Sequence, residues 1–332
     1  MTNSNKDLKS FIESQIEKTG FPTELEVMER IGSKGWEYVP SSIYCDYDEN
    51  IWREIDTIAF DCLKLVAGEA LYRVCADLVL DCKKSTDHAW VFVVPPRKDE
   101  EDWRRLFNID FFEPIRVAKQ AFMPVLNSLP SKNQPWLDSE LVRKELSNFM
   151  LPEKVSNLKD FQDLGLIQKE NFQYFMEGRI GLYGKEIRIS ENEKKSRSQI
   201  FESLLTVNKA LSYTARIDAG RVPSQITSLS HPKSKEDFLA TIEILIPLIV
   251  FDGALYSWEK QEGVIEQKQI LARSVYRSEH YNWSRLVPIV NIDYLPVFLD
   301  YLNRDLDRIH ESIIREFKKC DIQIQNLTKA VS

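Results

Sequence analysis

The chain has 332 residues, and 43% of them are hydrophobic and 29% charged, which is close to average globular usage and excludes wholesale disorder. It contains only 11 Gly and 14 Pro, so collagen-like and low-complexity architectures are excluded as well. Its 44 basic and 51 acidic side chains give a formal charge of -7, which argues against a protein that coats nucleic acid through bulk charge. Local binding of phosphates by a few basic side chains remains compatible with this net charge.

The sequence predicts a cytoplasmic protein with no membrane segment. Its first residues, MTNSNKDLKSFIESQIEK, contain no apolar run typical of a secretory signal. The longest uncharged apolar stretch covers 244–251, far below the roughly 18 residues that a membrane-spanning helix needs. None of the five cysteines forms a CxxC pair, so we expect buried, reduced thiols rather than a zinc site or a disulfide framework.

The first hundred residues predict one short helix followed by strands. Residues 22–34 have apolar side chains at helical spacing, and Gly35 ends the segment. An extended segment begins at Trp36, and the runs 53–60, 76–83 and 88–96 have strand composition, the last closed by prolines. The connection between 53–60 and 76–83 is too short for a crossover helix, so we expect these two strands to be antiparallel neighbours.

The rest of the chain predicts a polar, mainly helical region and then a return of strands. A helix is predicted over 199–217, with an apolar stripe and Gly220 just beyond it. The run that starts at Ala240 is apolar enough for a doubly covered central strand, and Asp252-Gly253 after it is typical of a hairpin turn. Two more strands are predicted, over 264–276 and 285–294. A long helix follows from Pro296, with an apolar stripe formed by Leu299, Leu302, Leu306, Ile309, Ile313 and Phe317.

These elements predict the α/β class, with a mixed β-sheet core flanked by helices. We divide the chain into a core at 20–96, a mainly helical insertion or specificity region at 97–240, and a part at 241–332 that returns strands to the sheet and ends in the long helix. Since strands are predicted at both ends of the chain, one discontinuous domain and two separate domains both remain open.

The residues with the clearest chemistry lie on the paired strands 53–60 and 76–83. Asp81 and Lys83 are two residues apart and therefore share a face of their strand, and pairing would bring Asp56 close to them. Burying such charges is costly unless they are paired or bind a metal. Two carboxylates with open positions between them suit Mg²⁺, which commonly uses one or two protein carboxylates together with substrate phosphate oxygens. The alternative is structural: Asp56 forms an ion pair with Lys83 or Arg53 on a solvated face of the sheet.

The order of these residues resembles a known family. Glu24 comes first, then Gly35-Trp36, Arg53-Glu54-Ile55-Asp56, Asp81-Cys82-Lys83-Lys84-Ser85 and Trp90-Val91-Phe92. This arrangement, over roughly residues 22–94, is similar to the PD-(D/E)xK or restriction-endonuclease-like nuclease superfamily, and most of all to its Mrr-like and archaeal Holliday-junction-resolvase-like branches.

The resemblance implies a restriction-endonuclease-like fold and a set of roles. Asp56 and Asp81 would be metal ligands, with the backbone carbonyl of Cys82 as a third, and Lys83 would be the catalytic lysine. The helix glutamate of the family would be Glu24, with Glu26 as the alternative.

We therefore expect a Mg²⁺-dependent DNA endonuclease, with Mn²⁺ as a possible replacement, that acts by metal-activated water in defence or DNA repair. Arg53, Lys84 and Ser85 are the expected nucleic-acid contacts. Two alternatives stay open, a catalytically silent nucleic-acid-binding or scaffolding protein on the same fold and a nuclease acting on RNA. A homodimer is expected if both strands of a duplex are cut, with the apolar stripe of the terminal helix as its contact.

Overall fold

The structure of the protein is a computed structural model. The described residues are 3–17, 19–67, 70–97, 113–117, 178–189, 198–218, 240–308 and 311. Most of the predicted insertion at 97–240 lies outside these residues, so its mainly helical character stays a prediction. The described parts of that range form three strands and one helix.

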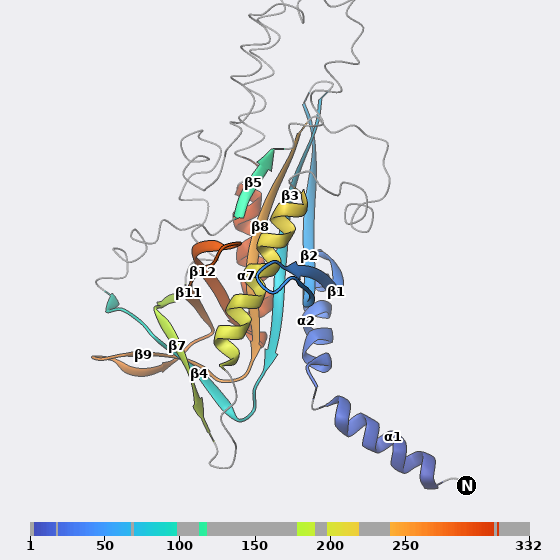
Figure 1. Cartoon of the computed structure of the whole chain (residues 1–332), viewed down its shortest axis with the longest axis vertical. Helices are drawn as coiled ribbons and strands as arrows, with labels where there is room; N and C mark the ends of the chain where they lie inside the picture. Colours follow the sequence, from blue (N-terminus) through green and yellow to red (C-terminus); the bar gives the residue numbers. More distant parts are fainter. Residues whose placement is uncertain are drawn as a thin grey trace, which may run out of the picture.

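The protein is mixed α/β, built around an eight-stranded sheet of parallel and antiparallel strands (Figure 1). Seven strands follow the order β1-β2-β3-β8-β12-β11-β6, and β5 pairs with β8 beside β12. The bounds are β1 (Glu37–Asp46), β2 (Ile51–Ala67), β3 (Ala70–Lys84), β5 (Glu113–Val117), β6 (Arg179–Gly181), β8 (Ala240–Asp252), β11 (Gln269–Arg277) and β12 (Asn282–Asn291). The expected antiparallel pairing of 53–60 with 76–83 is confirmed by the ladder between β2 and β3.

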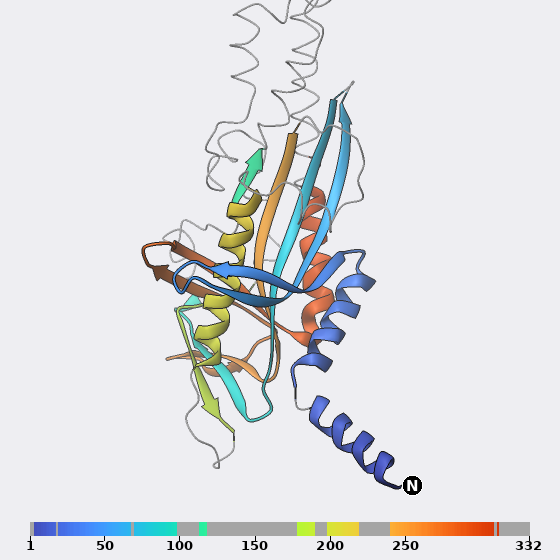
Figure 2. The ribbon, with the colours of Figure 1, turned by 45° about the vertical axis from the view of Figure 1, so that its right-hand side comes forward.

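Helices cover both faces of this sheet, because the strands are apolar on both sides (Figures 1 and 2). One face packs against α2 (Phe21–Ser33) and the terminal helix at 295–308, and the other packs against α7 (Gln199–Asp218). Strand β8 shows the alternation: Ile246 and Leu248 belong to the first core and Ile249 to the second. The helices predicted over 22–34 and 199–217 are thus confirmed.

The parallel pairing of β3 with β8 brings two distant segments together. It runs without interruption from Tyr72 opposite Ala240 to Lys84 opposite Asp252. The apolar run predicted as a central strand is therefore central, with β3 on one side and β5 and β12 on the other. Both β3 and β8 end at the same edge of the sheet, and that edge holds the candidate site described below.

A second, four-stranded sheet stands beside this edge, in the order β10-β9-β4-β7 (Figure 1). Its bounds are β4 (His88–Val93), β7 (Tyr183–Arg188), β9 (Leu255–Glu259) and β10 (Gly263–Glu266). Strands β4 and β9 continue from β3 and β8 and pair in parallel. The rings of Trp90 and Phe251 stack at a centroid distance of 4.1 Å and join the two sheets.

Two turn and strand predictions are wrong. Asp252-Gly253 is not a hairpin, because the strand after it pairs with β4 and β10 of the second sheet rather than folding back on β8. A Cβ at Gly253 would lie 2.8 Å from the carbonyl oxygen of Ser85, so the close approach of two chains at this corner requires glycine. The predicted strand at 264–276 is in fact two strands, β10 and β11, which belong to different sheets.

The described part of the terminal helix buries the apolar stripe that was the expected contact for a dimer. Leu299, Leu302 and Leu306 are 0–2% exposed and lie in the core cluster that packs α2 onto the sheet. Within the described residues, the apolar stripe of this helix is therefore used inside the molecule. Its continuation from Ile309 lies outside the described residues apart from Glu311.

The expectation of reduced thiols is wrong for Cys62, which is disulfide-bonded. The register of β2 and β3 places Cys75 directly opposite Cys62 on the neighbouring strand. Cys45 and Cys82 are free thiols, and Cys82 is buried. Sequence spacing gives no sign of a disulfide here, because positions 62 and 75 lie opposite each other only through the strand register.

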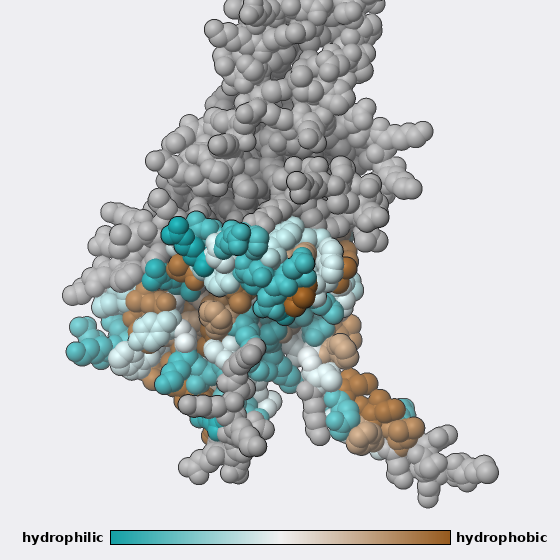
Figure 3. Space-filling view, in the orientation of Figure 1, coloured by the Kyte–Doolittle hydropathy of each residue, from teal (hydrophilic) through white to brown (hydrophobic). Residues whose placement is uncertain are grey.

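Helix α1 (Asn3–Ile16) extends away from the sheets (Figures 1 and 2). Its apolar side chains Leu8, Phe11 and Ile12 are 47–60% exposed. Figure 3 shows brown, hydrophobic surface on this helix at the lower right. None of the helices in the described segments is long and apolar enough to cross a membrane.

Candidate metal and nuclease site

Asp56 lies at the point where β2 and β3 separate. The ladder between the strands ends with Thr57 opposite Leu80. At the next position Asp56 turns its side chain to β3, and its Oδ2 accepts a hydrogen bond of 2.6 Å from the backbone N–H of Cys82. Burial raises the pKa of Asp56, although Lys83 and the Cys82 amide act in the opposite direction. The divergence of the strands thus leaves a carboxylate held against the Asp81-Cys82-Lys83 segment.

Asp81 is 2% exposed and forms an ion pair with Lys83. Lys83 Nζ lies 2.8 Å from Asp81 Oδ1 and 3.2 Å from the carbonyl oxygen of Cys82. The second oxygen, Oδ2, is buried and accepts no hydrogen bond, although the hydroxyl of Ser203 on α7 is near enough to lower the pKa somewhat. Burial dominates and, with a contribution from Asp56, raises the pKa of Asp81 to about 6.

Glu24 reaches the same place from the first turn of α2. Val27 and Ile31 on this helix are fully buried against the sheet, and the hydroxyl of Thr23 donates a hydrogen bond of 3.2 Å to Asp252 Oδ2 at the end of β8. Burial raises the pKa of Glu24, and the carboxylates of Asp56, Glu54 and Asp81 raise it further, while the ammonium of Lys83 acts in the opposite direction. The alternative, Glu26, forms an ion pair with Arg30 on its own helix, so the structure brings Glu24 to the site and not Glu26.

The electrostatic balance of the site is strongly acidic. Four carboxyl groups (Glu24, Glu54, Asp56 and Asp81) face one ammonium, that of Lys83. Burial lowers the pKa of Lys83, but the attraction of Asp81 and Asp56 outweighs burial and the net shift is upward. Lys83 is therefore a cation at neutral pH and acts here as a fixed positive charge rather than as a base.

This donor set suits a hard divalent cation. Among the described residues no three acidic, histidine or cysteine side chains are already arranged around a common point as a metal site. Mg²⁺ needs fewer, because it keeps several waters and is commonly held by one or two carboxylates. The buried and unpartnered Oδ2 of Asp81, the carboxylate of Asp56 and the carbonyl of Cys82 are oxygen donors of the right type, and an added cation would offset their mutual repulsion.

The raised pKa of Asp81 predicts that Asp81→Asn stabilises the metal-free protein at neutral pH. The folded-state pKa lies above the ordinary value of 3.8, so the fold favours the protonated carboxyl, and this contribution to stability is lost as pH rises from about 4 to about 6. Asparagine mimics the protonated form at every pH. We expect the variant to be more stable than wild type by roughly 2–3 kcal/mol at pH 7.5 in EDTA.

Urea unfolding of both proteins at pH 4 and pH 7.5 measures this effect. The advantage of Asp81→Asn should shrink at pH 4, where the wild-type carboxyl is largely protonated in the folded state and partly protonated in the unfolded state. An asparagine variant that is less stable than wild type at pH 7.5 would show that Asp81 is a well-compensated structural ion-pair partner of Lys83.

The three expected nucleic-acid contacts have different surroundings. Arg53 binds Asp46 at 3.0 Å and Glu49 at 2.6 Å, so its guanidinium is engaged in the hairpin and does not pair with Asp56. Lys84 lies 3.5 Å from Asp252. The Ser85 hydroxyl accepts a hydrogen bond from the backbone N–H of His88 and closes the turn between β3 and β4.

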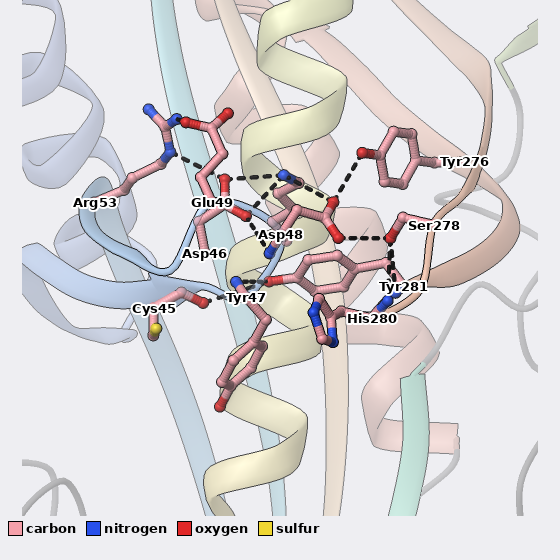
Figure 4. Close-up of polar contacts among 11 residues, drawn as sticks. Cys45, Asp46, Tyr47, Asp48, Glu49, Arg53, Tyr276, Ser278, His280 and Tyr281 are labelled. Atoms are coloured by element: carbon pink, nitrogen blue, oxygen red, sulfur yellow. Dashed lines mark hydrogen bonds and ion pairs between the residues drawn. The ribbon is translucent and has the colours of Figure 1, made fainter.

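A buried cluster outside the site holds the β1–β2 hairpin in place (Figure 4). Lys209 of α7 lies 2.8 Å from Asp46 and 3.2 Å from Asp48, and its side chain is 4% exposed. The same Asp48 accepts hydrogen bonds from the hydroxyls of Tyr276 and Ser278. The cluster therefore ties the hairpin, α7 and the end of β11 together, and β2 runs from this hairpin directly to Asp56.

Sequence reasoning missed several residues around the site. Ser203 interrupts the apolar stripe of α7 between Ile200 and Val207, which is a weak signal for a buried polar role. Asp252 was assigned only to a turn, and Lys209 only to a helix. Their contacts join segments more than 160 positions apart, so no local pattern could indicate them.

Comparison with known proteins adds no relative: no family model, no curated protein and no solved structure matches the chain. The chemistry of the site residues is therefore the basis of the proposed function.

Proposed function

We propose that the protein is a Mg²⁺-dependent endonuclease that hydrolyses phosphodiester bonds in DNA, and that its core belongs to the restriction-endonuclease-like fold. The observation that carries the proposal is the convergence of Glu24, Asp56, Asp81 and Lys83 from one helix and two diverging strands at one edge of the sheet. A cluster with this excess of buried acid is costly for a purely structural element. It is a suitable environment for a divalent cation and a phosphate.

Each residue has a role that follows from its surroundings. Asp56 and Asp81 would hold the cation, with the Cys82 carbonyl as a further oxygen donor. When bound, the cation would lower the pKa of a water and polarise the phosphodiester. The ammonium of Lys83, fixed by Asp81 at 2.8 Å, would stabilise negative charge that develops on the phosphate. Glu24, with its raised pKa, can hold or accept a proton at the rim of the site.

The substrate class and setting extend this proposal. Lys84 and Ser85 lie directly after Lys83 and are the proposed phosphate contacts, whereas Arg53 would have to leave its carboxylate partners to take part. Defence or DNA repair in the cytoplasm is the proposed setting. Disulfides are rare in the cytoplasm, so the disulfide at Cys62 counts against the cytoplasmic part of this proposal.

The test is cleavage of plasmid, linear duplex, single-stranded DNA and RNA in Mg²⁺, Mn²⁺ and EDTA. We expect cutting of DNA that depends on the cation and is lost in Asp81→Asn. Cutting of RNA alone would support the RNA nuclease, because discrimination between the sugars depends on contacts to the 2′-OH.

A separate binding measurement distinguishes the silent alternative. We expect Mg²⁺ or Mn²⁺ to raise the melting temperature of wild type and to leave that of Asp81→Asn unchanged, because a ligand stabilises the state that binds it. Nucleic-acid binding without cleavage, and without any effect of either cation on melting, would contradict the nuclease and favour a scaffolding or binding protein.

A further inference from the structure

We infer that the outer face of the second sheet is an interface between two copies of this chain, stacked about a two-fold axis parallel to the strands. This face is formed by the residues of β10, β9, β4 and β7 that point away from the main sheet. The inference does not depend on the proposed nuclease activity, and it replaces the terminal helix as the expected contact for a dimer.

The sheet has one buried and one exposed face. Trp90, Phe92 and Leu255 are 0–1% exposed and pack toward the main sheet. The alternate residues point outward, and three of them are large and apolar: Tyr183 is 62% exposed, Trp258 40% and Val264 62%. Open apolar surface of this kind, spread over four strands, is typical of an interaction site.

The strand register arranges the outer face in two rows. The first row is Tyr183, Val93, Trp258 and Val264, in the order β7, β4, β9 and β10. The second row, one pleat away, is Lys185, Val91, Tyr256 and Glu266. Each row therefore crosses the whole sheet from one edge strand to the other.

Each row is complementary to the same row of a second copy when the strands of that copy lie in the opposite order. Rotation about an axis parallel to the strands places β7 of one copy on β10 of the other and β4 on β9, while each row stays on itself. Tyr183 of one copy then faces Val264 of the other, and Val93 faces Trp258, so that a large side chain meets a small one at each position of the first row. Stacked sheets lie about 10 Å apart, a distance that such pairs fill.

The charges of the second row match in the same arrangement. Lys185 of one copy faces Glu266 of the other, and the symmetry produces this pair twice. Within its own chain Glu266 lies 3.4 Å from Lys268, but both side chains are more than 60% exposed, so that this pair is weak and Glu266 can change partners. Nucleic acid fits the face less well, because the two rows present one base and one acid instead of a cluster of cations.

Sedimentation velocity of the full chain over a range of micromolar concentrations tests the interface, with matched valine variants. We expect wild type to dimerise and Val264→Arg to raise the dissociation constant at least about tenfold, since the substitution enters a two-fold interface twice. The control is Val275→Arg on β11, whose valine is 54% exposed but lies outside the second sheet, and it should dimerise like wild type. A monomeric wild type, or equal effects of the two variants, would overturn the inference.

Charge reversal tests the orientation of the two copies. Lys185→Glu and Glu266→Lys should each weaken the dimer, because like charges then face each other, and the double variant should restore it. Both positions are exposed at the surface, so neither single variant should change the melting temperature of the monomer by more than about 2 °C. A double variant as weak as the singles would overturn the proposed two-fold arrangement.

Discussion

Replacing Lys83 with alanine is expected to lower the rate of metal-dependent DNA cleavage by about a hundredfold to a thousandfold, the usual effect of removing one preorganised charge from a transition state. The ammonium of Lys83 bridges Asp81 Oδ1 and the Cys82 carbonyl, and its pKa is raised, so it is positive throughout the range of an assay. The loss should therefore appear in kcat rather than in KM. Single-turnover cleavage of a labelled duplex at saturating Mg²⁺ measures the chemical step.

Two further variants serve as controls for Lys83→Ala. Lys260→Ala removes an exposed lysine after β9 and should cleave like wild type, which shows that general loss of charge is not responsible. Lys83→Arg retains the charge but changes its shape, and we expect only partial rescue because a guanidinium cannot occupy the compact position of an ammonium. Cleavage by Lys83→Ala at the wild-type rate would contradict the assignment of this lysine to the reaction.

Replacing Lys209 with methionine should lower the free energy of unfolding by about 3 kcal/mol. The substitution keeps the length of the side chain but leaves Asp46, which is 2% exposed, with Arg53 as its remaining cation, and removes the cation next to Asp48. Breaking a buried ion pair from one side is costly because the partner charge stays buried. The rings of Tyr276 and Tyr281, 5.6 and 5.3 Å from Nζ, lose their cation in the same step.

Urea unfolding followed by circular dichroism measures this loss, with Lys268→Met as the control. Lys268 forms an ion pair with Glu266 that is open to water, so its loss should cost less than about 1 kcal/mol. If the two variants lose equal stability, the cluster around Lys209 is no stronger than an ordinary surface ion pair. Lys209→Met should also be assayed for cleavage at temperatures where the variant is folded. A lower cleavage rate than that of wild type would show that the hairpin positions Asp56.

Local sequence patterns are enough to predict the core of the candidate site. Apolar and polar alternation predicts the strands that carry Asp56 and Asp81, and the short connection between them makes the pair antiparallel. Two-residue periodicity then places Asp81 and Lys83 on one face. The helix with Glu24 could be predicted for the same reason, because its apolar side chains recur at helical spacing. All of this information is local, and local patterns express themselves directly in secondary structure.

The tertiary structure alone decided which distant segments meet. Pairing of β3 with β8 brings Asp252 beside Lys84, and the packing of α2 brings Thr23 to the same aspartate, while Glu26 pairs with Arg30 on its own helix. Asp252-Gly253 has the sequence of a hairpin turn, yet the chain passes there into another sheet because Leu255 and its neighbours pair with β4.

The disulfide and the buried cluster around Lys209 could not be predicted for the same reason, because both depend on contacts between separate segments of the chain. Cys62 is disulfide-bonded where the β2–β3 register sets Cys75 opposite it, and Lys209 is neutralised by aspartates 163 and 161 positions earlier in the chain. The sequence of a single strand or helix predicts which face is apolar, but it does not specify which other element will pack on that face. The partner is selected when the apolar surfaces of all the elements are buried together, and this selection is a property of the whole fold.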